Sequence, residues 1–202
     1  MTMMRTLGAS AVALLFAASF AAAQAPQTVR VRATLENVSV PMLTAKARDG
    51  AEMKIKLADN APVNEVVKAS LSDIKADSYI AVTAMPQPDG TQKAVAILIF
   101  PEAMRGVGEG HRPWDLEPNS TMTNATVAEQ VAGTDGQTVT VKYKDGDKKI
   151  LVTPATIIVT YKKSAASELK AGQKIFVAAA KKLDDGTLEA PNVAYGDVGV
   201  WR

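Results

Sequence analysis

The feature that most constrains this chain is an internal repeat, in which one unit of sequence is used twice. Four short segments recur in the same order at offsets of 92 to 96 residues. The recurring pairs are Ala33–Leu35 with Ala125–Val127, Arg48–Gly50 with Lys144–Gly146, Ile74–Asp77 with Leu169–Gly172, and Asp89–Thr91 with Asp185–Thr187. The repeat predicts two similar domains, residues 24–100 and 122–202, joined by an ordered connecting segment, 101–121.

Hydrophobic residues alternate with polar ones in both units, which predicts β-strands with one buried face. Residues 29–35 and 53–57 alternate in this way, and 94–100 is a continuous apolar run that predicts a strand buried on both faces. The Asp-Gly pairs favour tight hairpin turns before or between such strands. The expected core residues are Val31, Leu35, Ile55, Leu57, Ile80, Val82 and Ile97, with Val139, Val141, Ile175 and Val177 in the second unit.

The spacing of hydrophobic residues changes from every second residue to every third or fourth in the middle of each unit, which predicts a short helix there. Val63, Val66, Val67, Leu71 and Ile74 recur at helical spacing, and residues 164–170 form a shorter and weaker counterpart. Three strands, a helix and two further strands is the order of the OB-fold. We therefore expect an all-β protein with short helices, built as two tandem five-stranded OB-like barrels, with a two-sheet β-sandwich as the alternative.

The first 23 residues read as a signal peptide. Arg5 precedes an apolar stretch at 7–20, and the small residues Ala21–Ala23 suit a signal peptidase. The alternative is an N-terminal membrane anchor, although the stretch is short for a bilayer core of roughly 30 Å. We expect cleavage after Ala23, export to the periplasm and a mature chain that does not span the membrane.

Composition narrows the chemistry that the chain can perform. It has no cysteine, one histidine, 5% aromatic residues and a formal net charge of +2. Cysteine nucleophiles, thiolate zinc sites and iron–sulfur clusters are therefore excluded, and nothing favours nucleic-acid binding. Asp115 and Ser120 are near His111 in the sequence, but their flexible Gly- and Pro-rich setting does not favour a preorganised catalytic triad. The Asp pairs lie at turns, where Asp is ordinary, so we expect no enzyme and no cofactor.

The connecting segment is where functional residues concentrate. It holds the single histidine and one of the two tryptophans. One interpretation is an ordered clasp in which Trp114 packs on a barrel. The other is a loop that binds a ligand or partner through Glu109, His111, Arg112, Trp114 and Asp115. A mixed metal site would draw on His111, Met104 and Met122, since thioether sulfur suits Cu(I).

Residues 100–106, 108–116 and 120–126 resemble a family of exported proteins from alphaproteobacteria and their relatives, of the domain-of-unknown-function type with OB-like β-barrels. The resemblance implies a periplasmic location and supplies no catalytic residues. Some similar sequences are labelled metal-transporter permeases, but this chain lacks the membrane spans of a permease. We expect a periplasmic non-catalytic binding or adaptor protein that contacts an envelope protein or a small ligand. The alternative is a metal-binding periplasmic protein that uses the His111 segment.

Overall fold

The computed structural model describes residues 28–133 and 136–200, and the expected signal peptide, 1–23, lies outside them. The described chain is all-β with three short 3₁₀ helices, as predicted. The first half contains β1 (Thr28–Ser39), β2 (Met42–Ala47), β3 (Glu52–Leu57), β4 (Val63–Lys68), η1 (Leu71–Asp73), β5 (Tyr79–Pro86), β6 (Gln92–Ile99) and η2 (Glu102–Met104). The second half contains β7 (Gly110–Pro113), β8 (Thr121–Gly133), β9 (Gly136–Tyr143), β10 (Gly146–Val152), β11 (Ile157–Ser164), η3 (Ala166–Glu168), β12 (Lys174–Lys182), β13 (Leu188–Ala190) and β14 (Val193–Tyr195).

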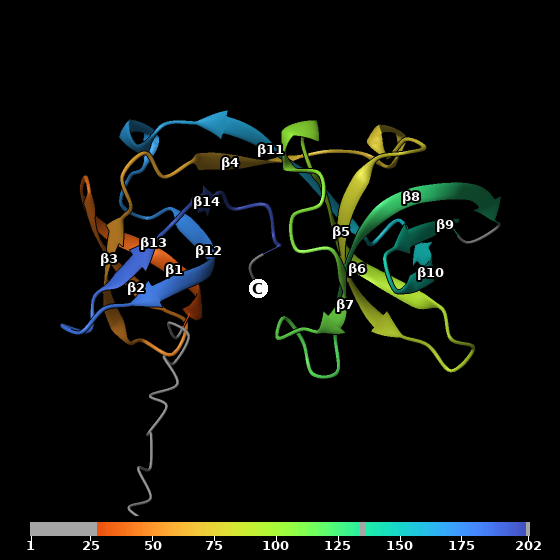
Figure 1. Cartoon of the computed structure of the whole chain (residues 1–202), viewed down its shortest axis with the longest axis horizontal. Coiled ribbons are helices and arrows are strands. Elements are labelled where there is room, and N and C mark those ends of the chain that lie inside the picture. Colours follow the sequence, from red (N-terminus) through yellow and green to blue (C-terminus); the bar gives the residue numbers. More distant parts are fainter. Residues whose placement is uncertain (1–27, 134–135, 201–202) are drawn as a thin grey trace, which may run out of the picture.

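The strands close into two five-stranded rings, which lie side by side in Figure 1. The first ring runs β1–β2–β3–β13–β12 and returns to β1. The second ring runs β8–β9–β10–β6–β5 and returns to β8. The two five-stranded barrels that the strand order predicts are therefore present.

Each ring takes strands from both halves of the sequence. The first ring joins β1–β3 to β12 and β13, and the second joins β8–β10 to β5 and β6. Equivalent parallel pairs make the two junctions, Ile55 with Leu188 in one ring and Ile150 with Gln92 in the other. We expected each half to close a barrel of its own. The halves instead exchange their last two strands, so one hydrogen-bonded path links all the described strands except β7.

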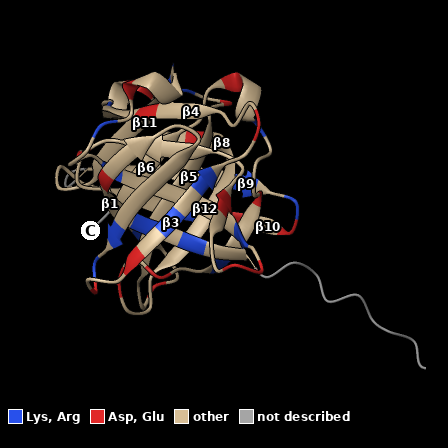
Figure 2. Ribbon diagram, turned by 90° about the vertical axis from the view of Figure 1, so that its left-hand side faces the viewer, with Lys and Arg blue, Asp and Glu red and all other residues tan. Residues whose placement is uncertain are grey.

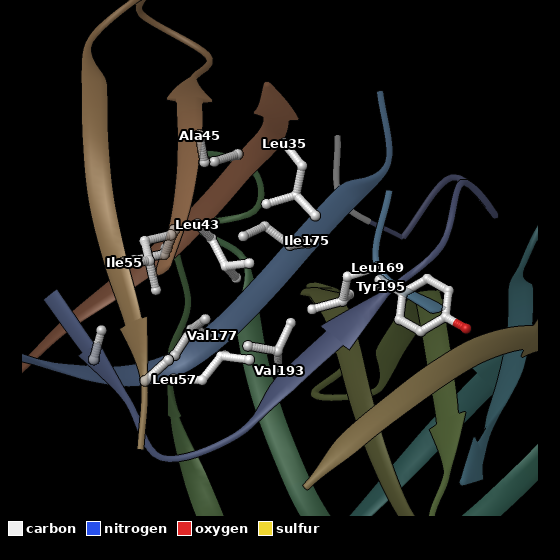
Figure 3. Packing of buried hydrophobic residues seen from close by; sticks show 14 of the residues in the cluster. Leu35, Leu43, Ala45, Ile55, Leu57, Leu169, Ile175, Val177, Val193 and Tyr195 are labelled. Atoms are coloured by element: carbon white, nitrogen blue, oxygen red, sulfur yellow. The ribbon is translucent and has the colours of Figure 1, made fainter. Parts of the chain in front are cut away.

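The buried residues confirm the predicted alternation. All the core positions expected from the sequence are buried. The core of the first ring mixes the two halves, and Figure 3 shows Leu35, Leu43 and Ile55 packed with Ile175 and Val177. Burial of these apolar side chains is the main stabilising term in each ring, so each ring depends on residues from both halves.

The predicted helix at 63–74 is wrong over most of its length, and the one predicted at 164–170 is present only as the short 3₁₀ helix η3, Ala166–Glu168. Residues 63–68 form β4, which pairs with both β11 and β14, and only residues 71–73 turn as a 3₁₀ helix. β4 and β11 run antiparallel across the top of Figure 1, between the rings. The spacing of Val63, Val66 and Val67 fitted a helix, but β-branched side chains suit a strand, and two neighbouring strands satisfy the backbone.

A third apolar cluster lies between the rings, where β4, β6, β11, β12 and β14 meet. Its buried members are Val66, Ala96, Val159, Phe176, Ala194 and Val200. Among the described residues, no helix has the length and hydropathy needed to cross a membrane.

Candidate functional site

The connecting segment is held in place by hydrogen bonds to the second ring. The Val107 carbonyl oxygen accepts hydrogen bonds from the Tyr79 hydroxyl at 3.1 Å and from the Asn124 side-chain amide at 2.9 Å. The Arg105 guanidinium donates to the Asp77 carbonyl oxygen at 2.8 Å. The next residues form β7, which pairs with the start of β8. The segment is therefore an ordered part of the fold.

A tight loop after β7 carries Trp114 towards the first ring. The backbone N–H of Trp114 donates to the Ser120 carbonyl oxygen at 2.8 Å, and the Ser120 hydroxyl donates back to the Trp114 carbonyl oxygen at 3.2 Å. The Trp114 side chain packs against the third apolar cluster, as the clasp interpretation predicts, but it is half-buried where we expected it to be largely buried.

Three guanidinium groups surround the Trp114 ring. Arg30 lies over it with its Cζ atom 3.7 Å from the ring centroid, and the Cζ atoms of Arg32 and Arg112 lie at 5.6 Å and 5.7 Å. The negative face of an aromatic ring attracts cations at such distances. Arg30 and Arg32 belong to β1 of the first ring, whereas Arg112 belongs to β7. The five residues Arg30, Arg32, Arg112, Trp114 and Asp115 are called the Trp114 cluster below.

Asp115 bridges the two arginines of β1. One carboxylate oxygen lies 2.7 Å from Arg30 and the other lies 2.8 Å from Arg32. The hydrogen bond from Arg32 is the main cause that holds the pKa of Asp115 well below its ordinary value, and the hydrogen bond from Arg30 adds to it. Partial burial of the carboxylate raises the pKa but does not cancel this effect. Asp115 is therefore ionised at neutral pH, and it fixes the connecting segment to β1.

The Trp114 cluster carries more positive than negative charge, because it contains three guanidinium groups and one carboxylate. Burial, and then the nearby Arg30, lower the pKa of Arg112 from its ordinary value. The Arg32 side chain is only 10% exposed, and its Nε atom has no hydrogen-bond partner among the described residues. In Figure 2 the Lys and Arg residues along β3 and β12 lie among Asp and Glu residues, so the outer side of this ring carries charges of both signs. The excess of positive charge within the Trp114 cluster itself favours an anion.

The other residues singled out in the sequence lie on the β7 side of the segment. The Nδ1 atom of His111 lies 2.8 Å from the Thr123 hydroxyl, and its ring stacks on Tyr143. Burial first, and then Lys148 and Arg112, lower its pKa. The Glu109 carboxylate accepts a hydrogen bond from the Lys144 backbone N–H at 2.9 Å.

The two methionines proposed as metal ligands lie on separate elements. Met104 ends η2, and Met122 pairs with Arg112 across β7 and β8. Both are half-buried. Within residues 28–133 and 136–200, no group of three or more His, Asp or Glu side chains is placed to hold a metal ion.

Sequence reasoning found three members of the Trp114 cluster and missed Arg30 and Arg32. These two arginines occupy the outward positions of an alternating strand, where basic residues are ordinary. The available signal was that two arginines recur at i and i+2 and therefore project from the same face of β1. Nothing local indicated that Asp115, 83 residues away from Arg32, would pair with them.

Comparison of the chain with models of known protein families, with curated proteins and with solved structures finds no match.

Proposed function

We propose that this protein is a periplasmic, non-catalytic binding or adaptor module whose contact site is the Trp114 cluster. The N-terminal signal-peptide pattern supports the compartment. The observation that carries the proposal is the gathering of three arginines on one half-buried tryptophan, at the junction of two rings. Tryptophan and arginine are the residue types that contribute most often to binding energy at protein interfaces.

The architecture supports a binding role for this site. Arg30 and Arg32 lie on β1 of the first closed ring, and Arg112 lies on β7, which pairs with β8 of the second ring. The connecting segment is tied by hydrogen bonds to the second ring. A site on rigid elements loses little conformational entropy when a partner binds. Arg30 and Asp115 remain accessible, with side chains 29% and 50% exposed.

Cross-linking from a single cysteine tests the proposal, because the chain has no cysteine of its own. Glu117→Cys places a thiol on an exposed position two residues after Asp115. Glu168→Cys, in the exposed η3, is the matched control. Each variant is labelled with a photoactivatable cross-linker and irradiated in envelope extract.

We expect the Glu117→Cys protein to form a defined adduct that the Glu168→Cys protein does not form. The adduct should disappear when Arg30→Gln and Arg112→Gln are added. Adducts that are the same from both positions, or that survive the loss of both arginines, would contradict the proposal.

A further inference from the structure

The Trp114 cluster has an unbalanced charge that its own residues do not neutralise. Asp115 supplies one carboxylate to Arg30 and Arg32, and the guanidinium of Arg112 is paired with the neutral carbonyl oxygen of Gly108 at 2.8 Å. Like charges held close together in a partly desolvated place repel one another strongly. A second anionic group at the cluster would relieve that repulsion.

The donors of the cluster suit a phosphate group in particular. A guanidinium presents N–H groups in a planar fork that matches the oxygens of phosphate or carboxylate. Phosphate carries close to two negative charges and three strong acceptor oxygens, so it matches the excess charge of three arginines and one aspartate better than a single carboxylate does. The buried Nε atom of Arg32, which has no partner among the described residues, is a further unused donor.

We infer that the Trp114 cluster is a phosphate-binding site, in which the phosphate contacts Arg30 and Arg112 and competes with Asp115 for the arginines of β1. This inference rests on the proposed function and names the chemistry of its ligand. Asp115 acts as an internal anion that holds the guanidinium groups together and limits the affinity for the external one. The phosphate belongs either to a lipid headgroup or to a soluble phosphate compound.

Calorimetric titration of the full chain with inorganic phosphate at low ionic strength tests the inference. The variants are Arg30→Gln, Arg112→Gln and Asp115→Asn, with Arg48→Gln as control, because Arg48 is an exposed arginine in the turn after β2. Arg32 is left intact because its side chain is only 10% exposed. Unfolding midpoints establish that each variant is folded before it is titrated.

We expect Arg30→Gln and Arg112→Gln each to weaken phosphate binding at least tenfold, and Arg48→Gln to leave it unchanged. Asp115→Asn removes the competing carboxylate and should tighten binding several-fold. The inference is overturned if neither the unmodified protein nor Asp115→Asn binds phosphate, if Arg48→Gln weakens binding as much as the cluster variants do, or if a folded Asp115→Asn binds less tightly.

A second measurement identifies the source of the phosphate. Vesicles containing phosphatidic acid, whose phosphate is a monoester, are compared with vesicles of phosphatidylcholine alone. Binding to the first that inorganic phosphate reverses indicates a lipid headgroup, whereas binding of inorganic phosphate alone indicates a soluble compound. If the Glu117→Cys adduct depends on the arginines but no phosphate binds, the inference fails and the proposed function stands.

Discussion

At the scale of single residues, Trp114 joins the connecting segment to the first ring in two ways. It packs against the third apolar cluster, and it lies beneath the Arg30 guanidinium at 3.7 Å. Such a cation–π contact contributes about 0.5–2 kcal/mol, depending on its exposure. The indole therefore adds an electrostatic contact to its apolar packing.

We expect Trp114→Ala to lower the free energy of unfolding by about 2 kcal/mol, which is less than a fully buried tryptophan would cost. Val107→Ala is the control, since Val107 lies in the same segment but is 49% exposed, and its effect should stay within about 0.5 kcal/mol. Denaturant melts give both values. An unchanged midpoint for Trp114→Ala would contradict the clasp role.

Asp115 should make the free energy of unfolding depend on pH at acidic pH values, below the ordinary carboxyl pKa. Its pKa is lowered in the folded protein, so the unfolded chain binds a proton there more readily. The resulting stabilisation is present above the ordinary carboxyl pKa of about 3.9 and is lost as the pH falls from there towards the lower folded value. Because the carboxylate is half exposed, we expect it to contribute no more than about 1 kcal/mol.

Melts of the unmodified protein and of Asp115→Asn across pH measure this contribution. The gap between the two midpoints should be the same at pH 5 and pH 7 and should narrow progressively as the pH falls below about 4. A gap that widens on acidification would show that Asp115 does not stabilise the fold through its charge.

At the scale of elements, alternation predicted the strands well because side chains of a half-buried strand must change face at every residue. The helix predicted at 63–74 is wrong because the spacing of its valines fits two kinds of element. Valines spaced by three and four residues fit one face of a helix, but they also suit a strand buried between two neighbours. β4 is such a strand, and its pairing with β11 and β14 is not visible in its own sequence.

The end of β14 should tolerate little change, because its backbone lies close to β4. Gly196 has φ of +148°, and a Cβ atom there would lie 2.8 Å from the Val66 carbonyl oxygen of β4. Gly186 also has a positive φ, +83°, but no atom lies within 4 Å of the position of its Cβ. Both glycines avoid backbone strain, and only Gly196 also avoids a collision.

We expect Gly186→Ala to cost about 1 kcal/mol, the strain of a left-handed residue. Gly196→Ala should cost about 3 kcal/mol, because displacement of the Val66 backbone is added to that strain. Thermal or denaturant unfolding of the pair compares them directly. Equal losses would mean that β14 shifts away from β4 at little cost.

At the scale of the whole molecule, the exchange of strands between rings could not be predicted from the repeat. Both halves carry the same alternation, so either pair of closing strands fits either ring equally well by pattern. The same limit applied to the candidate site. Trp114 and Asp115 stand out in the sequence. Arg30 and Arg32 can be recognised as site residues only in the folded protein, where β1 lies against the connecting segment and both arginines pair with Asp115.

Cutting the chain between its halves tests the exchange. A protease recognition sequence is inserted between Arg105 and Gly106, which are both exposed. After cleavage, the two fragments should elute together in native size-exclusion chromatography and separate only in denaturant, because each ring contains strands of both. The uncut insertion variant, with an unchanged midpoint, is the control. Fragments that separate without denaturant would contradict the strand exchange.

The exchanged strands also decide how ring closure responds to dilution. Two copies of one half-length chain that paired in this way would form a symmetric dimer, whose stability depends on the concentration of protomers. In the single chain, the connecting segment fixes the partner strands at an effective concentration set by its own length. Ring closure is therefore independent of how abundant the protein is, although each ring requires strands from both halves.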